Sequence, residues 1–137
     1  MREILFRGKR ISGYRDGLKD GTMIYGHLFV DKQGAYKIKW YDAHLGMAKT
    51  SNVDPKTVGQ FTGLYDKKGT TKIFEGDIVK GKDYLEEGLE VYGYVDHRNG
   101  SFVIVGNFLI HYRWLDYEVE VIGNIHDNPE LLKGEME

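Results

Sequence analysis

Carboxylate side chains beside a glycine are the first residues whose types and spacing suggest chemistry. The segment Glu75-Gly76-Asp77 could form a loop for a metal ion or a phosphate, or a corner where the chain changes direction. Glu118 and Glu120 form another carboxylate pair, but they alternate with valines, which is typical of one face of a half-exposed strand. Lys or Arg would have to lie opposite them to offset their repulsion. General acid-base catalysis needs two carboxyl groups at a fixed gap in a cleft, and the linear sequence shows no cleft.

Other groups that catalyse reactions or bind metals are sparse. The chain has no cysteine, which excludes disulfides and thiolate zinc sites and suits a reducing cytoplasm. The histidines form no His-x-His or His-x3-His pair that one strand or helix would present to a metal; they are His27, His44, His97, His111 and His126. No Gly-x-Ser-x-Gly, Walker A or dinucleotide-binding motif is present. We therefore expect a protein that is not an enzyme and that uses no metal or cofactor.

Basic residues give the best argument for a ligand. In the segment YKIKWYD, residues 36–42, Lys37 and Lys39 share one face of a strand, and the other face holds Tyr36, Ile38 and Trp40. A nucleic-acid surface needs cations and aromatic rings together, so this separation favours a solvated lysine face and a buried aromatic face. Nucleic-acid contact therefore remains an alternative. The residues that could contact an anionic partner are Arg7, Lys9, Arg10, Lys37 and Lys39.

Composition and charge set the broad class. The 137 residues include 18 glycines, 10 tyrosines and only 2 prolines, which favours many turns and short strands. The N-terminus has no signal-peptide pattern, and no apolar run approaches the ~18 residues of a membrane helix. Residues 1–82 hold 16 Lys and Arg against 9 Asp and Glu, a net +7, whereas residues 83–137 hold 3 against 12, a net −9. The two parts could face each other, within one chain or between subunits, or the basic part could form a surface that binds an anionic partner. The first interpretation requires no ligand and is preferred.

Hairpin signals place these residues on strands. Segments 22–31 and 34–42 flank a loop that contains Gly34, segments 56–66 and 71–80 flank the turn 66–69, and segments 89–97 and 100–106 flank Asn99-Gly100. Residues 43–57 are expected to form a loop with a turn at Asp54-Pro55. Near the C-terminus, Pro129 follows a capping Asp or Asn and predicts a short helix.

Four collinear matches suggest an internal repeat. Residues 4–9, 24–38 and 57–63 resemble residues 72–77, 91–104 and 121–127, with Tyr25-Gly26 over Tyr92-Gly93 and, in the same segment, Gly34 over Gly100. One of these matches places Phe74-Glu75-Gly76 over Phe6-Arg7-Gly8, which keeps the Phe and the Gly but reverses the charge. A ligand site would depend on that charge, whereas a corner depends on the glycine. The acids at 75 and 77 are therefore predicted to be structural.

Four sequence segments, which together extend from Met1 to about Leu132, are MREILFRGKR, YGHLFVD, VDPKTVGQFTGLYDKKGTTKIFEGDIV and VIGNIHDNPELL. Taken together and in this order, they resemble the YopX family of bacteriophage and prophage proteins. The resemblance implies a small, mainly β protein that is encoded by a phage or prophage and acts in the cytoplasm of the bacterial host. It supplies no catalytic residues.

We accordingly expect an all-β, YopX-like single domain over residues 1–133, followed by a frayed tail at 134–137. Two similar β units, about 1–66 and 69–130, would form a barrel-like or sandwich architecture with a short C-terminal helix. The expected function is that of a non-enzymatic binding or assembly module, a homo-oligomer with a possible host or phage protein partner and no membrane contact. The alternative is a nucleic-acid-binding accessory protein, and a small hydrolytic enzyme is less favoured.

Overall fold

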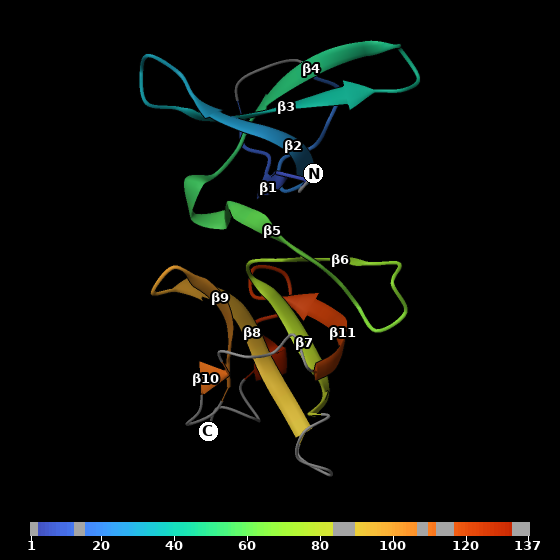
Figure 1. Ribbon diagram of the computed structural model, residues 1–137. Helices are drawn as coiled ribbons and strands as arrows, with labels where there is room; N and C mark the ends of the chain where they lie inside the picture. Colours follow the sequence, from blue (N-terminus) through green and yellow to red (C-terminus); the bar gives the residue numbers. More distant parts are fainter. Residues whose placement is uncertain (1–2, 13–15, 84–89, 107–109, 112–116, 133–137) are drawn as a thin grey trace. The chain divides into compact units, whose positions relative to one another are not determined.

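The computed structural model describes residues 3–12, 16–83, 90–106, 110–111 and 117–132. The chain divides into two compact units, unit 1 (Met1–Phe61) and unit 2 (Thr62–Glu137). Each unit contains an antiparallel sheet, and residues 130–132 are helical, so the predicted all-β fold class with a short C-terminal helix is confirmed (Figure 1). The expected frayed tail at 134–137 lies outside the described residues.

A six-stranded sheet has the order β4-β3-β2-β1-β5-β6, and unit 1 contains β1 to β4 and the start of β5, while β6 belongs to unit 2. The elements of unit 1 are β1 (Phe6–Lys9), β2 (Met23–Val30), β3 (Tyr36–Asp42), β4 (Met47–Asn52), a short 3-10 helix (Pro55–Thr57) and β5 (Gly59–Tyr65), which continues into unit 2. The predicted β2–β3 hairpin is confirmed, and Val30 pairs with Tyr36 at its end. In the loop, the Asp31 carboxylate accepts hydrogen bonds from the backbone N–H groups of Gln33 and Ala35, both at 2.9 Å.

The strand β4 lies within the segment that was expected to be a loop. Its sequence, MAKTSN, holds few strand-forming residues, but it pairs with β3 from Lys37–Asn52 to Asp42–Met47. Pairing with a strong strand therefore overrides the weak local preference. The buried core of unit 1 is small and consists of Ile24, Ile38 and Val53, with Leu18, Leu28, Trp40 and Val58 packed against them.

Unit 2 contains a sheet with the order β10-β9-β8-β7-β11. Its elements are β6 (Lys72–Phe74), β7 (Asp77–Asp83), β8 (Glu90–Arg98), β9 (Ser101–Val105), β10 (Ile110–His111) and β11 (Tyr117–Asn124). The β8–β9 hairpin turns at Asn99 (φ 53°) and Gly100 (φ 81°), as the Asn-Gly pair predicted. The core of unit 2 is larger than that of unit 1 and comprises Ile73, Val79, Val91, Val95, Ile104 and Val119.

Five strands of the six-stranded sheet, β1 to β5, follow the same order as β7 to β11 in the five-stranded sheet, and β6 has no counterpart. Gly26 in β2 and Gly93 in β8 hold equivalent places, because a Cβ on either would lie 2.1 Å from a carbonyl oxygen of the neighbouring strand, that of Lys39 or of Val105. Neither strand order closes on itself among the described residues, so the sheets do not form a closed barrel. In unit 1, an isolated antiparallel β-bridge joins Arg10, which follows β1, to Val53, which follows β4.

The corner at Glu75-Gly76-Asp77 is structural. Gly76 has a φ of 93°, and its N–H donates to the carbonyl oxygen of Val95 at 2.8 Å. The Asp77 carboxylate is buried and accepts a hydrogen bond from the Phe74 N–H at 2.7 Å. However, Gly8 lies inside β1 rather than at a corner, so the two glycines that the repeat alignment matched differ in their backbone roles.

Candidate functional site

The side of the unit 1 sheet opposite its core carries exposed aromatic side chains. Along β2, the buried Ile24 and Gly26 alternate with Tyr25, His27 and Phe29. Tyr25 is 49% exposed and Phe29 is 43% exposed, and large apolar groups gathered on one side of a sheet are typical of interaction surfaces. We call this side of the sheet the outer face.

Strand register brings lysines to the outer face. His27 pairs with Lys39 and Phe29 pairs with Lys37 across β2 and β3, and paired residues in an antiparallel sheet project to the same side. Tyr41 follows Lys39 by two residues on β3, shares its side of the strand and is 67% exposed. Within β3, Ile38 and Trp40 lie on the core side, opposite Lys37 and Lys39, as expected from the alternation. The expectation considered β3 alone, however, and β2 adds aromatic rings to the lysine side.

Strand β1 adds two further cations to this side. Arg7 pairs with Tyr25 and Lys9 pairs with Met23. The outer face therefore comprises Arg7, Lys9, Met23, Tyr25, His27, Phe29, Lys37, Lys39 and Tyr41.

The residues predicted to contact an anionic partner have different surroundings. Lys39 is exposed and Lys9 is half-buried, whereas the Lys37 side chain is only 11% exposed and its Nζ lies 3.2 Å from a carboxylate oxygen of Asp31. Arg7 lies on the outer face but is buried. The set is thus brought to one sheet, with Lys39 as its most accessible cation.

Arg10, the remaining member of that set, belongs to a buried polar network. Its Nε donates to both carboxylate oxygens of Asp16, at 2.7 and 2.8 Å, and it also pairs with Asp20. The Ser51 hydroxyl donates to Asp16, and Trp40 Nε1 donates to Ser51 Oγ at 2.9 Å. The network therefore connects Arg10 to the ring of Trp40 through two buried side chains.

The charge of Asp16 is stabilised by this network. Burial would raise the pKa of its carboxyl group, but hydrogen bonds from Arg10, Ser51 and the Leu18 N–H outweigh burial and lower the pKa to about 2. Asp16 is therefore ionised at neutral pH. Arg10, held by Asp16 and Asp20, serves the structure of unit 1 rather than an anionic ligand.

A cavity of about 290 Å³ lies where β2 and β3 carry Tyr25 and Tyr41. The residues that line it are Leu18, Thr22, Met23, Ile24, Tyr25, Trp40 and Tyr41. Three of the seven are aromatic, and none carries a formal charge. The cavity is therefore an apolar recess that shares Met23, Tyr25 and Tyr41 with the outer face.

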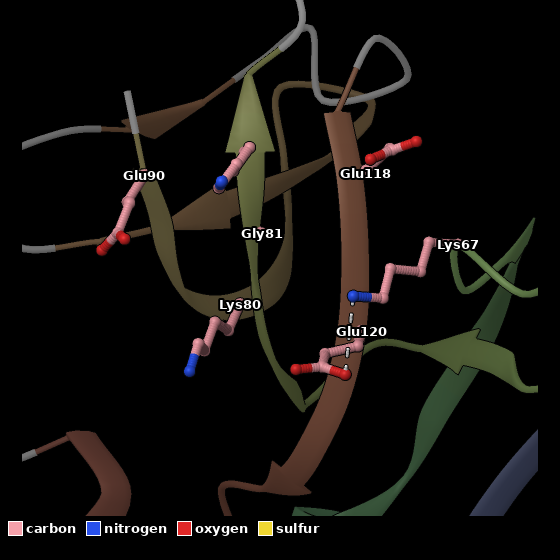
Figure 2. A pocket seen from close by; sticks show the side chains of 7 residues that line it. Lys67, Lys80, Gly81, Glu90, Glu118 and Glu120 are labelled. Atoms are coloured by element: carbon pink, nitrogen blue, oxygen red, sulfur yellow. Dashed lines mark ion pairs between the residues drawn. The ribbon is translucent and has the colours of Figure 1, made fainter. Parts of the chain in front are cut away.

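Unit 2 contains a second recess, lined by charged residues (Figure 2). Glu118 and Glu120 on β11 pair with Lys82 and Lys80 on β7, as offsetting their repulsion required. Lys67 Nζ lies 3.9 Å from Glu120 Oε2, along the dashed line in Figure 2. The recess holds three lysines and three glutamates, and its lining therefore has no net charge that would attract an anion.

This second recess also bears on the charge division along the sequence. Lys67, Lys80 and Lys82 come from the basic part, residues 1–82, and Glu118 and Glu120 come from the acidic part. The structure thus supports the interpretation that the two parts face each other, at least in unit 2. Some of the charge division needs no second subunit and no ligand.

Metal-binding clusters and membrane-spanning helices are both absent from the described residues. No group of three or more His, Asp or Glu side chains in these residues could hold a metal ion. Of the helices in the described part of the chain, none has the length and apolar character needed to cross a membrane.

Comparison with family models gives a match to the family described as YopX protein over residues 17–133. The chain belongs to the YopX family. The match includes β2 and β3, which carry most of the outer face, but it begins after β1. No curated protein sequence matches this YopX chain.

Sequence reasoning missed the aromatic members of the outer face. The alternation in MIYGHLFV already places Tyr25, His27 and Phe29 on one side of β2. The missing information was the register: the loop from Asp31 to Ala35 sets Phe29 opposite Lys37, and a shift by one residue would have turned the rings away from the lysines.

Proposed function

We propose that this YopX protein is a non-enzymatic binding module that holds single-stranded nucleic acid on the outer face of unit 1. The observation that carries the proposal is the register of β2 and β3, which sets Phe29 beside Lys37 and His27 beside Lys39, with Tyr25 and Tyr41 exposed on the same side. Single strands are bound where aromatic rings stack on bases and cations meet phosphates.

The charge of unit 1 favours an anionic ligand. Residues 1–61 hold 11 Lys and Arg against 6 Asp and Glu, a net +5, while residues 62–137 hold 8 against 15, a net −7. Several acids of unit 1 are engaged in ion pairs: Asp16 with Arg10, Asp31 with Lys37 and Asp42 with Lys49. Unit 1 therefore has a net positive charge, which would attract phosphates.

Assembly into homo-oligomers is a weaker candidate for the function. The argument for it is the charge division along the sequence, and unit 2 already offsets part of that division with Lys80 opposite Glu120 and Lys82 opposite Glu118. The outer face, by contrast, has both chemical groups that a single strand requires. Nucleic-acid binding, the alternative at the level of sequence, therefore becomes the first choice, within a phage or prophage programme as the family resemblance implies.

The test is a titration of fluorescently labelled oligothymidine, followed by anisotropy at low and at physiological salt. Wild-type protein is expected to bind more tightly at low salt, because binding releases counterions from the strand. Lys39→Glu is expected to weaken binding about ten-fold and to reduce the salt dependence by about one to two ions. Lys39 is exposed, so the variant should fold.

The matched control is Lys68→Glu, which makes the same charge change at an exposed turn of unit 2. It is expected to change the affinity less than about two-fold, because Lys68 is not part of the outer face. Absence of binding at low salt, or equal weakening by the two variants, would overturn the proposal. A double strand that binds as tightly as the single strand would also contradict it, because paired bases cannot stack on the exposed rings.

A further inference from the structure

The cavity beside the outer face has the size and lining for a small planar group. Its volume of about 290 Å³ lies just below the range for pockets that bind drug-sized molecules, roughly 300–1,000 Å³, and suits a smaller group. Tyr25, Trp40 and Tyr41 supply aromatic surface, and Thr22 supplies a hydroxyl group. A flat ring with polar edges suits such a lining better than an aliphatic chain does.

The wall formed by Trp40 is held in place before any ligand arrives. Its Nε1 donates to Ser51 Oγ at 2.9 Å, and Ser51 is itself fully buried and bonded to Asp16. The Lys49 ammonium lies 5.6 Å from the centroid of the Trp40 ring and 3.1 Å from a carboxylate oxygen of Asp42. Because the ring is already oriented, binding would cost little side-chain entropy.

The position of the cavity identifies the planar group. Tyr25 and Tyr41 belong both to the cavity and to the outer face, and Tyr41 lies two residues from the exposed Lys39. A strand whose phosphates lie near Lys39 would therefore carry its bases past the mouth of the cavity. We infer that the cavity receives one nucleobase of that strand, while the other bases stack on the outer face. This inference rests on the proposed function and adds a base-binding site to it.

The test compares two probes, a short oligothymidine and an oligomer of the same length in which every position is abasic. Wild-type protein is expected to bind oligothymidine at least ten-fold more tightly, since stacking contributes to affinity only when bases are present. Tyr41→Ala removes one wall of the cavity at a residue that is 67% exposed, so the fold should tolerate it. The variant is expected to lose about ten-fold in affinity for oligothymidine and little for the abasic oligomer.

Tyr65→Ala is the matched control, since Tyr65 is an exposed strand tyrosine in unit 2. It should keep the wild-type ratio of the two affinities. If Tyr41→Ala also keeps that ratio while Lys39→Glu weakens both probes, the cavity takes no base, and the inference fails although the proposed function stands. If the wild type binds neither probe, the proposed function fails and the inference fails with it.

Discussion

Tyr25 in unit 1 and Tyr92 in unit 2 hold equivalent positions on their strands but have different surroundings. Tyr25 pairs with Arg7 on the outer face of unit 1, and Tyr92 pairs with Lys80 on β7 of unit 2. Tyr25 is half exposed, whereas the Tyr92 hydroxyl donates a 2.5 Å hydrogen bond to the carbonyl oxygen of Leu131. The C-terminal segment of the chain thus contacts this tyrosine in unit 2, whereas the Tyr25 side chain in unit 1 remains half exposed.

The same contrast holds for apolar surface in general. Ten large hydrophobic side chains are exposed among the described residues, and nine of them lie in unit 1. Unit 2 instead has the larger buried core, and the lysines and glutamates of its charged recess offset one another. Among the described residues, large exposed apolar side chains are thus concentrated in unit 1, and this difference supports the proposal that unit 1 carries the binding face.

The largest expected loss of stability comes from glycine substitutions that test whether β2 and β8 are equivalent strands. Gly26→Ala and Gly93→Ala each place a Cβ about 2.1 Å from a backbone carbonyl oxygen, which must move because no flexible side chain can yield. We expect each substitution to lower the free energy of unfolding by about 3 kcal/mol in urea denaturation. Gly8→Ala is the milder control, because its Cβ would meet only side chains of Val53 and Val58, at 3.0 Å or more.

Similar losses of stability for both variants would support the equivalence of β2 and β8. A large loss for Gly93→Ala and none for Gly26→Ala would contradict that equivalence. That result would mean that β2 can move away from β3, and the register that sets Phe29 beside Lys37 would then lack its support.

A somewhat smaller effect is expected from acid through Asp16 in unit 1. Asp16 has a pKa of about 2 in the folded protein and 3.8 as its ordinary value. Its contribution to stability is therefore fully present above pH 3.8 and is lost as the pH falls towards 2. The shift corresponds to about 2 kcal/mol of the free energy of unfolding.

The measurement is urea denaturation between pH 5 and pH 2, read by NMR signals that are assigned separately to the two units. Asp16→Asn should remove this part of the pH dependence of unit 1 and should destabilise it at pH 5. Its control is Asp54→Asn, which changes an acid that caps the 3-10 helix without a place in the network. A pH dependence in unit 1 that survives Asp16→Asn unchanged would contradict the role given to the network.

Local signals in the sequence predicted much of the fold. Asn99-Gly100 indicated one hairpin, the alternation around Ile38 indicated a buried strand face, and Gly76 indicated a corner, because each depends on neighbours within a few residues. Strand β4 was missed, since its polar sequence becomes a strand only through pairing with β3.

The candidate site depended more on distant contacts and was predicted only in part. Lys37 and Lys39 were recognised as members of the outer face. Arg10 was grouped with them because the sequence near it does not reveal the buried network. In that network Asp16 bonds both Arg10 and Ser51, which lies 35 residues after Asp16 in the chain. The exposed rings of Tyr25 and Phe29 could be assigned to the lysine face only after the β2–β3 register was known.

The most direct test of the central claim is to map the bound strand on the protein by NMR. Backbone amide shifts are recorded as oligothymidine is added at low salt to the full chain. We predict that the shifts of β2 and β3 change, from Tyr25 to Phe29 and from Lys37 to Tyr41, while those of β8 and β9 in unit 2 stay constant. Shift changes concentrated in β8 and β9, or no changes at saturating oligothymidine, would contradict the claim that unit 1 holds the open binding face.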